Sequence, residues 1–456
     1  MTSPLYDLFV IGTGLAGQDV ALACAEAGWS VGIADERPFG GTCPLRGCDP
    51  KKVLVHAAHA ADQVRRLAGG HGLSGDPQID WGELMAFKRT FTAPIPGGVE
   101  EKLDEAGVDC YHSAARFTGE RTLAVGGETV EAEHVLIATG ATPMELGIEG
   151  EEHLTRSDEF LEMDALPERL VFIGGGYISM EFAHLAARAG AGAVTMLEMT
   201  ERVLQGFEPD VVEAVVAATG ALGVQIETER RVRAIEKDGD TLTVVAEREG
   251  EENGDRERYP ADAVVHGAGR VPHLDALDLE AAGVERNDDG TLALSEHLRS
   301  TSNPAVYAAG DAAQQGPPLT PVAHLDGRAV EKALLADGEP PNYAGTPSVV
   351  FTTPRLASVG LTEAEARDSG FDVAVESGDA SGFFHPRHRR QEHAFYKVLA
   401  EAGSGRVLGA HLAYPHAEEV INVFALAVRE GLRVNDLKAG VYTYPSAASD
   451  VQYMLP

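Results

Sequence analysis

A glycine-rich loop near the start of the chain restricts its fold more than any other feature. Residues 5–11 (LYDLFVI) are typical of a buried parallel strand, and a helix-like run follows at 18–27. Between them stand Gly12, Gly14 and Gly17 in the spacing G-x-G-x-x-G. Glycines at this spacing permit a tight turn and let a pyrophosphate approach the N-terminus of the helix closely. The pattern predicts an α/β unit that binds a dinucleotide.

An acidic residue in the expected place strengthens this prediction. Residues 31–35 read as a second strand, and that strand ends in Asp35. A carboxylate about 20 residues beyond such a loop can accept a hydrogen bond from a ribose hydroxyl. A G-x-G-x-x-G sequence alone is weak evidence, but strand, loop, helix and acid in this order are specific.

The same unit occurs a second time in the chain. Residues 170–173 read as another buried strand, and Gly174 and Gly176 follow it. In the helix that comes next, Ser179 takes the place of the third glycine, and a residue this small still allows the helix to pack closely on the strand. Two such units in one chain predict two bound nucleotides.

The second unit also carries an acid at the end of its second strand. That strand, at 193–198, ends in Glu198. A carboxylate there pairs with the adenosine 2′-hydroxyl and repels a 2′-phosphate. We therefore expect NADH as the coenzyme, with NADPH possible because Arg202 follows closely.

Two of the four cysteines, Cys43 and Cys48, lie in the segment GGTCPLRGCDPKK. Two cysteines this close can close a small ring, and strained or exposed disulfides tend to be the labile, catalytic ones. The basic residues Arg46, Lys51 and Lys52 are expected to lower the thiol pKa and favour the thiolate. A structural disulfide is the alternative, but such bonds rarely persist in the cytosol except as redox devices.

Charge and hydropathy exclude several classes of function. The chain has 71 acidic and 37 basic residues and a net charge of −34, which argues against binding to nucleic acid or to an anionic membrane. No apolar run approaches the ~20 residues that span a bilayer. The N-terminus lacks the pattern of a secretory signal, so we expect a cytoplasmic protein. The acidity fits adaptation to a salty cytoplasm, or simply an acidic, arginine-rich proteome.

No metal site is expected. The C-terminal histidines show no tight ligand spacing, and we expect them at the surface or at an interface: His385, His388, His393, His411 and His416. Cys24 and Cys110 have no basic or ligand-forming cluster nearby in the sequence, so we expect ordinary buried thiols.

The cysteine segment resembles the redox motif of the class I flavoprotein disulfide reductases, which include glutathione reductase, dihydrolipoamide dehydrogenase and mercuric reductase. That motif reads roughly GGTCxNxGCxPxK. Here Leu45 replaces the usual Asn, and Asp49 replaces the usual apolar residue. The order of the other motifs extends the resemblance over essentially the whole chain. It implies a homodimer whose active site is shared between the subunits.

The resemblance also implies an architecture. The fold would be α/β, with two nested Rossmann-like dinucleotide-binding domains, one for FAD and one for NAD(P), and a C-terminal α+β dimerisation domain. The FAD-binding domain would comprise 1–148 and 267–343, the NAD(P)-binding domain 149–266, and the dimer-interface domain 344–456.

Periodicity and alternation predict further elements. The helices are expected over 53–67, 81–106 and 418–430. The strands are expected over 241–246 and 256–265, as a hairpin with a turn at 247–255, and over 347–359, 382–384, 394–399 and 407–412.

The resemblance assigns cofactor contacts residue by residue. For FAD the matching positions are Gly12, Gly14, Gly17, Asp35, Gly41, Thr42, Lys52, Ala115, Thr139, Gly140, Asp311, Thr320 and Ala323. For the nicotinamide nucleotide they are Gly174, Gly176, Tyr177, Glu181 and Glu198. Two more, Gly269 and Arg270, stand where the chain returns to the FAD domain. Tyr177 would shield the nicotinamide pocket, or would only pack at the start of its helix.

Catalytic roles follow from the same resemblance. NADH would reduce the flavin, and the flavin would pass electrons to the disulfide. Cys48 would be the sulfur nearest the flavin, and Cys43 would be the thiol that attacks an outside disulfide. Lys52 and Glu181 would form an ion pair beside the flavin.

The C-terminal tail departs from the family pattern. Relatives carry a His–Glu pair that the partner subunit supplies as acid, and the matching positions here are Tyr444 and Ser449. A phenol with an ordinary pKa of ~10 stays protonated at neutral pH and can still donate a proton. The alternative is that Tyr444 only packs in the pocket.

Three functions remain open from the sequence. The first is an FAD-dependent, NADH-preferring reductase of a low-molecular-weight disulfide other than glutathione disulfide, because Leu15 and Leu22 replace residues that contact glutathione in relatives. The second is an NAD(P)H:quinone or reactive-oxidant reductase, and the third is a non-enzymatic redox-sensing or assembly subunit. Mercuric ion reduction is not expected, since no cysteine follows Cys110.

Overall fold

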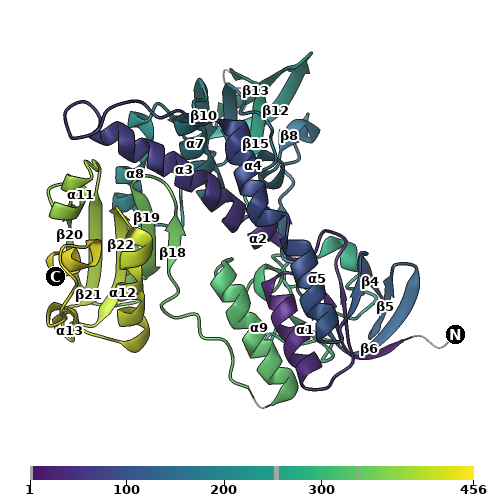
Figure 1. Cartoon of the computed structure of the whole chain (residues 1–456). Helices are drawn as coiled ribbons and strands as arrows, with labels where there is room; N and C mark the ends of the chain where they lie inside the picture. The colour runs from purple at the N-terminus through teal and green to yellow at the C-terminus, as the bar shows by residue number, and fades with distance from the viewer. Residues whose placement is uncertain (1–3, 251–255, 337) are drawn as a thin grey trace. The chain divides into compact units, whose positions relative to one another are not determined.

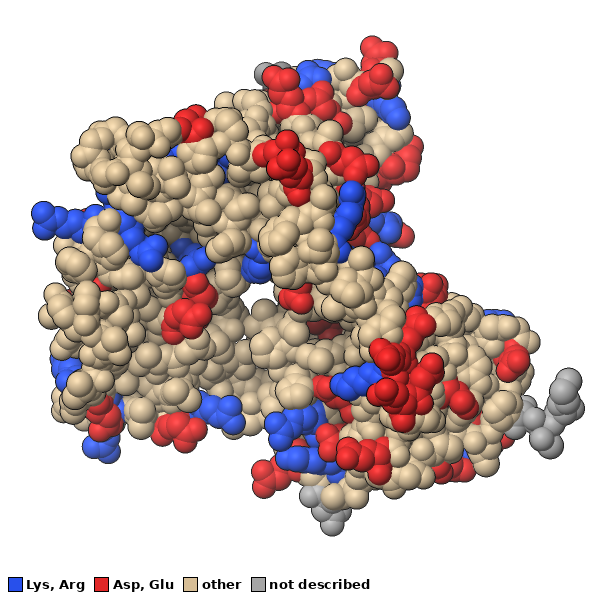
Figure 2. Space-filling model, in the orientation of Figure 1, with Lys and Arg blue, Asp and Glu red and all other residues tan. Residues whose placement is uncertain are grey.

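The computed structural model describes residues 4–250, 256–336 and 338–456. The chain forms two compact units, each made of three segments (Figure 1). Unit 1 comprises Met1–Lys51, Phe87–Met144 and Arg270–Tyr343, and unit 2 comprises Lys52–Ala86, Glu145–Gly269 and Ala344–Pro456. Acidic side chains are spread over the surface of both units, as the net charge of −34 implies (Figure 2).

Unit 1 is built on a seven-stranded sheet in the order β3-β2-β1-β6-β5-β4, with β17 beside β6. Its strands are β1 Leu5–Ile11, β2 Val31–Ala34, β3 Asp109–Tyr111, β4 Ala115–Gly119, β5 Thr122–Val125, β6 Glu128–Ile137 and β17 Val306–Ala308. The pairings are parallel except for β6–β5 and β5–β4 at one edge, which are antiparallel, so β5 runs opposite to the other strands. Parallel strands are covered on both faces, which explains the buried apolar run at residues 8–11 in the second half of β1.

Helices of unit 1 include α1 Leu15–Glu26, which begins at the first glycine loop and packs beside α9 Thr320–Leu335 (Figure 1). Two short strands, β7 Ala141–Pro143 and β16 Arg270–Pro272, pair antiparallel. The cysteine segment forms α2 Thr42–Arg46 and the start of α3 Cys48–Leu67. The helix predicted over 53–67 is therefore confirmed, and it begins five residues earlier.

The single helix predicted over 81–106 is wrong. Two helices occupy this range, α4 Trp81–Thr92 and α5 Ile95–Glu105. Pro94 and Pro96 stand at the break. Proline has no N–H to donate, and its ring clashes with the preceding turn, so a helix tends to end before it and a new one can start with it.

Unit 2 contains a five-stranded parallel sheet in the order β11-β10-β9-β15-β8. Its strands are β8 Leu154–Thr155, β9 Arg169–Ile173, β10 Ala193–Leu197, β11 Gln225–Glu227 and β15 Ala263–His266. The helices that belong to this part are α6 Ser157–Phe160, α7 Tyr177–Ala189 and α8 Pro209–Ala221. The second strand–glycine loop–helix unit is confirmed as β9, its loop and α7.

A three-stranded antiparallel sheet of β12 Arg230–Asp238, β13 Thr241–Arg248 and β14 Glu257–Ala261 accompanies the parallel one. The strand predicted over 256–265 is wrong as one element, because β14 ends and β15 enters the parallel sheet. Asp262 marks the division, since its carboxylate accepts hydrogen bonds from Arg169 at the start of β9. Of the turn predicted at 247–255, residues 251–255 lie outside the described part.

The C-terminal part of unit 2 is a five-stranded antiparallel sheet with helix α12 packed against it. The strands are β18 Ser348–Val350, β19 Arg355–Gly360, β20 Val373–Asp379, β21 Phe395–Glu401 and β22 Val407–Tyr414. The helices are α10 Glu363–Asp368, α11 Phe384–His388, α12 Ala417–Glu430 and α13 Val434–Lys438. The range 347–359, predicted as strand, forms a hairpin of β18 and β19. The strand predicted over 382–384 is wrong, because Phe384 begins α11. The α/β class with a C-terminal α+β part is confirmed.

Candidate active site

The first glycine loop has the tight geometry that its sequence predicts. Gly12 has a φ of +109°, and a Cβ there would stand 2.3 Å from the carbonyl oxygen of Ala138. A Cβ on Gly17 would stand 2.2 Å from the carbonyl oxygen of Gly12, so the helix packs directly on the loop. A Cβ on Gly14 would meet nothing within 4 Å. The loop is closed toward the protein and open at the N-terminus of α1, as a pyrophosphate needs.

Asp35 lies at the end of β2 with its carboxylate turned to this loop. It accepts hydrogen bonds from the backbone N–H of Thr13 at 2.9 Å and from the Thr13 hydroxyl at 2.7 Å. The backbone N–H of Arg37 binds its other oxygen at 2.9 Å. These bonds fix the carboxylate at the loop, where the sequence predicts a ribose contact.

The cysteine segment packs on the same loop. Gly41 has a φ of +76°, and a Cβ there would stand 2.5 Å from the Cα of Gly14. The backbone N–H of Gly40 donates to the Thr13 hydroxyl at 3.2 Å. Only glycine allows this close approach of two backbones. The segment therefore brings Thr42, at the start of α2, and the cysteines to the nucleotide loop within unit 1.

Both cysteines of the segment are thiols in this structure, Cys43 partly exposed and Cys48 exposed. A hydrogen bond with Cys48 and burial both raise the pKa of Cys43. Cys43 Sγ also lies 3.9 Å from the Asp49 carboxylate, whose charge raises the pKa further. Cys48 Sγ lies 3.9 Å from the hydroxyl of Thr320, the first residue of α9. The expectation that basic neighbours lower the thiol pKa is therefore wrong for Cys43.

Several further residues of unit 1 fit FAD. The Thr139 hydroxyl is buried and has no hydrogen-bond partner among the described residues, and such a group is costly unless a ligand satisfies it. Burial raises the pKa of Asp311, a carboxylate placed to accept a hydrogen bond, although Arg270 opposes the shift. Gly140, the residue after Thr139, has a φ of +69°.

Three other FAD positions supply space rather than polar groups. Ala115 is buried at the first position of β4. A Cβ on Gly310 would stand 3.3 Å from the Cβ of Ala323, so small residues meet where α9 approaches the turn before Asp311. Arg270 donates to the carbonyl oxygen of Ala141 across the β7–β16 pair.

The second glycine loop has the same closed geometry within unit 2. Gly174 has a φ of +91°, and a Cβ there would stand 2.5 Å from the Cα of Ala268. Gly176 is the N-cap of α7. Gly269, which follows β15, has a φ of +121°. Ser179 is fully buried at the place of the third glycine. The loop thus fits a second dinucleotide.

Glu198 is held at this loop in the way Asp35 is held at the first. Its carboxylate accepts from the backbone N–H of Gly175 at 2.6 Å and from that of Thr200 at 2.8 Å. The Arg202 guanidinium donates to the carbonyl oxygens of Leu204, Gln205 and Phe207. Arg202 is the residue for which the sequence analysis kept NADPH possible, and here its guanidinium is hydrogen-bonded to backbone carbonyls of its own loop.

Lys52 and Glu181 form the ion pair that the resemblance implies. Lys52 Nζ lies 2.7 Å from Glu181 Oε2, and the Glu181 side chain is only 1% exposed. The other carboxylate oxygen accepts from the backbone N–H of Phe351 at 3.0 Å, and Lys52 Nζ lies 3.9 Å above the Phe351 ring. Tyr177, at the first position of α7, is 41% exposed.

The tail places Tyr444 at the surface of unit 2, with 74% of its side chain exposed. Its neighbour in the family pattern, Ser449, is buried, as is Asp450. The Asp450 carboxylate accepts a hydrogen bond from the Tyr414 hydroxyl, and burial raises its pKa. Asp450 is thus occupied inside the fold and does not stand in for the missing family glutamate.

Sequence reasoning missed Asp326, a buried acid of α9. Its carboxylate accepts from the backbone N–H of Gly310 at 2.9 Å and from the Tyr343 hydroxyl at 2.7 Å, and burial raises its pKa to about 6. It fixes the turn that carries Asp311. An acid six residues into an otherwise apolar helix face was the signal available in the sequence.

The remaining expectations have mixed outcomes. Cys24 is fully buried, and burial raises its pKa to about 12, whereas Cys110 is only half-buried. His411 is buried between the Ser358 hydroxyl at 2.6 Å and the Leu361 carbonyl at 3.0 Å, and His385 is buried beside Tyr414. A surface position is therefore wrong for these two histidines.

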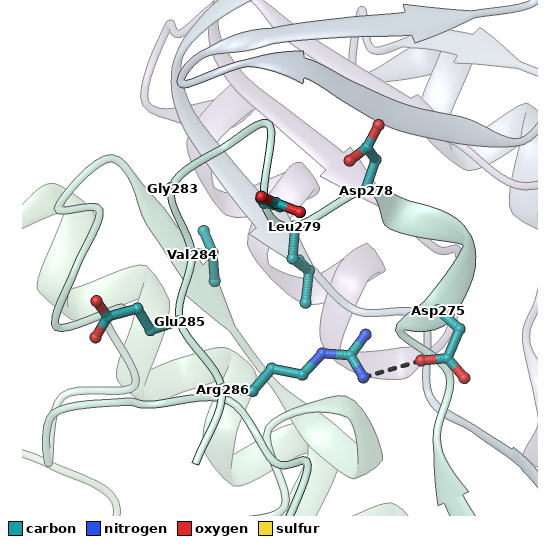
Figure 3. A pocket seen from close by; sticks show the side chains of 8 residues that line it. Asp275, Asp278, Leu279, Gly283, Val284, Glu285 and Arg286 are labelled. Atoms are coloured by element: carbon teal, nitrogen blue, oxygen red, sulfur yellow. Dashed lines mark hydrogen bonds and ion pairs between the residues drawn. The ribbon is translucent and has the colours of Figure 1, made fainter. Parts of the chain in front are cut away.

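No group of three metal-ligating side chains stands together in the part of the chain that the structure describes. In that part no helix is long and apolar enough to cross a membrane. A hollow of about 500 Å³ in unit 1 is lined by acidic residues and by Arg286, which binds Asp275 at 2.9 Å (Figure 3). None of the expected site residues lines it.

Two nucleotide loops, with a pair of hydrogen-bonded thiols packed on the first, define a dinucleotide-dependent disulfide oxidoreductase. The chain belongs to the pyridine nucleotide-disulphide oxidoreductase family: the family model matches residues 6–327, and the model of its dimerisation domain matches residues 346–455. These matches confirm FAD and a pyridine nucleotide as cofactors, and they support a homodimer.

Similar proteins span almost the full chain. A dihydrolipoyl dehydrogenase of Haloferax volcanii is 35% identical over 98% of this chain and 94% of its own. A glutathione reductase of Burkholderia cepacia is 32% identical over 98% and 97%. Among solved structures, the HOCl-induced flavoprotein disulfide reductase RclA from Escherichia coli matches with a TM-score of 0.87 and 27% identity, covering 98% of this chain and 99% of that one.

Proposed function

We propose that the chain reduces a low-molecular-weight disulfide with NADH, through Cys43 and Cys48. The observation that carries the proposal is the packing of the cysteine segment on the first glycine loop, through Gly41 and Gly14. The thiols are thereby attached to the loop that would hold FAD, together with Asp35 and the unsatisfied Thr139 hydroxyl. Bound FAD supplies two-electron transfer between the nicotinamide and the sulfur pair.

The chain's own residues account for the sulfur chemistry. The Cys43 thiolate attacks one sulfur of the outside disulfide, so that a mixed disulfide forms and one substrate thiolate leaves with a proton. Cys48 then attacks the Cys43 sulfur and releases the second substrate thiol, which leaves a Cys43–Cys48 disulfide. The pair has been oxidised by two electrons and the substrate reduced by two. The hydrogen bond with Cys48 raises the pKa of Cys43, so the two thiols lose their protons one at a time rather than together.

The leaving thiolate needs an acid. Tyr444 of the partner subunit takes that role in the proposal, since it is exposed and can present its phenol to another chain. Asp450 cannot assist it as a base, because its carboxylate is bound to the Tyr414 hydroxyl. Lys52 and Glu181 would hold the flavin environment, as a nearly buried pair whose charges compensate each other.

NADH is preferred in this proposal because Glu198 faces the position of the 2′-hydroxyl and Arg202 is engaged elsewhere. We expect kcat/KM for NADH to exceed that for NADPH at least roughly 10-fold, since opposing like charges costs several kcal/mol and 1.4 kcal/mol is a factor of ten. Glu198→Gln keeps an acceptor for Gly175 and removes the repulsion, so the ratio should fall toward one. Glu213→Gln, on the exposed face of α8, is the matched control. A wild-type preference for NADPH would contradict the assignment.

A second function has one specific observation in its favour. The HOCl-induced flavoprotein disulfide reductase RclA from Escherichia coli matches this chain over nearly its full length. In that function the acceptor would be a quinone or a reactive oxidant reduced at the flavin, and the cysteines would be a relay or bystanders. The two functions differ in their need for Cys43.

A further inference from the structure

One surface of unit 2 has the opposite charge from the rest of the chain. Residues 385–393 read HPRHRRQEH, with three arginines, three histidines and a single acid, in a chain whose net charge is −34. Basic side chains gather over α11 at the left of the view in Figure 2, where Figure 1 places that helix. A basic surface in so acidic a chain attracts anionic groups.

The basic segment adjoins Tyr444. Phe384, at the start of α11, is 54% exposed, and its ring centroid lies 6.5 Å from that of Tyr444. One turn later His388 stacks on Phe384, with ring centroids 5.1 Å apart and an interplanar angle of 24°. Arg387 stands next to His388 on the same short helix. The exposed aromatic surface around Tyr444 is therefore bordered by basic side chains.

Hydrogen bonds to helix α3 fix the position of the basic segment that follows α11. Arg390 and Arg66 bind each other's backbone, Arg66 Nη1 to the Arg390 carbonyl at 2.9 Å and Arg390 Nη1 to the Arg66 carbonyl at 3.2 Å. Gln63 Nε2 reaches the carbonyl of Arg389 at 3.4 Å. These bonds hold the segment that follows α11 on helix α3, so its charges stay beside the aromatic surface.

Arg387 is the arginine of this segment that lies on α11 itself. Its side chain is exposed, and in the described part of the chain no carboxylate lies within ion-pair distance of it. Glu392 is the only acid of the segment, and Asp450, which is buried, accepts a hydrogen bond from the Tyr414 hydroxyl. A guanidinium without an acid, in a chain with 71 acidic residues, is positioned to receive a carboxylate from outside.

We infer that Arg387, with His388 and Arg390, forms an anion-binding rim next to Tyr444, and that the disulfide substrate carries carboxylate or phosphate groups. The inference rests on the proposed function, in which Tyr444 serves the disulfide. Phe384 and Tyr444 supply an apolar surface for the carbon skeleton, and Arg387 binds the anionic group. The rim is a specificity device, since it contacts the substrate away from the sulfurs.

Two colorimetric disulfides test the rim in the full-length holoenzyme. One is dianionic, 5,5′-dithiobis(2-nitrobenzoate), and the other is neutral, 4,4′-dithiodipyridine. Arg387→Gln should lower kcat/KM for the dianion about 10-fold more than for the neutral probe, mostly through KM, because only the dianion loses a hydrogen bond to a charged group. Added KCl should weaken the wild-type preference for the dianion. Arg248→Gln removes an exposed, paired arginine elsewhere in unit 2 and is the matched control.

Three other results would contradict either the anion-binding rim or the proposed function. Equal losses on both probes, or a monomer on size-exclusion chromatography, would make Arg387 a structural or subunit-contact residue and overturn the rim. Reduction of both probes with no selective change in Arg387→Gln would overturn the rim while leaving the proposed function intact. A wild-type holoenzyme that oxidises NADH with a quinone yet reduces neither probe would overturn the proposed function itself.

Discussion

Replacing Cys43 with serine is expected to abolish NADH-dependent disulfide reduction, with a loss of at least roughly 10³-fold in kcat, as when other enzymes lose their nucleophile. A serine hydroxyl cannot form the mixed disulfide, and it leaves Cys48 without its partner. The bound flavin should remain, because the loop contacts of Gly41 and Gly14 do not involve the sulfur. The measurement is NADH oxidation with a disulfide and, separately, with a quinone.

The comparison of the two acceptors separates the candidate functions. Quinone reduction should survive in Cys43→Ser, since it needs only reduced flavin. Cys110→Ser is the matched control, because Cys110 is half-buried and bound to the Val108 carbonyl, away from the glycine loop. Disulfide reduction that persists in Cys43→Ser would assign the cysteines to a bystander role and favour the oxidant reductase.

Replacing Lys397 with methionine is expected to destabilise unit 2 by about 3–5 kcal/mol, the usual cost of leaving a buried charge unpaired. Lys397 is only 6% exposed, and its Nζ lies 2.8 Å from Glu208, 2.8 Å from Asp210 and 2.7 Å from Glu363. Without the ammonium, Glu208 stays buried next to two other carboxylates. Urea unfolding should show a lower midpoint.

A lower pH should reduce the difference in stability between the wild-type protein and Lys397→Met. Lys397 lowers the pKa of Glu363, so the pair stabilises the fold above the ordinary glutamate pKa of about 4.3, and the stabilisation is lost as the pH falls through the lowered value. The Lys397 pKa is raised, so its own contribution is present throughout the neutral range. Lys102→Met, on the exposed face of α5, is the control and should leave the midpoint unchanged. A midpoint for Lys397→Met equal to that of the control would refute the role of the network.

The parts of the fold that the sequence predicts well are those set by local chemistry. A strand followed by closely spaced glycines can hardly be arranged otherwise, because Gly12 and Gly17 lie against backbone where any side chain would clash. The acids Asp35 and Glu198 follow from the same geometry, since each caps the loop of its own unit. The order of the domains along the chain is predicted from the resemblance to the family.

The parts that fail depend on partners far away in the chain. The division of 256–265 into two strands requires the pairing of Asp262 with Arg169, which no local pattern reveals. The pKa of Cys43 depends on which neighbour reaches the sulfur, and here Cys48 and Asp49 do so rather than a lysine. The ion cluster of Lys397 joins three segments, so its members look like ordinary surface charges in sequence.

The ion cluster of Lys397 has a practical consequence. The chain contains eight lysines, and Lys397 is held among three carboxylates. An amine in that setting is protonated and screened from acylating reagents, whereas an exposed amine such as that of Lys102 reacts freely. Peptide mass spectrometry after brief acetylation would therefore report, at a single amine, when α8 and the C-terminal sheet come apart.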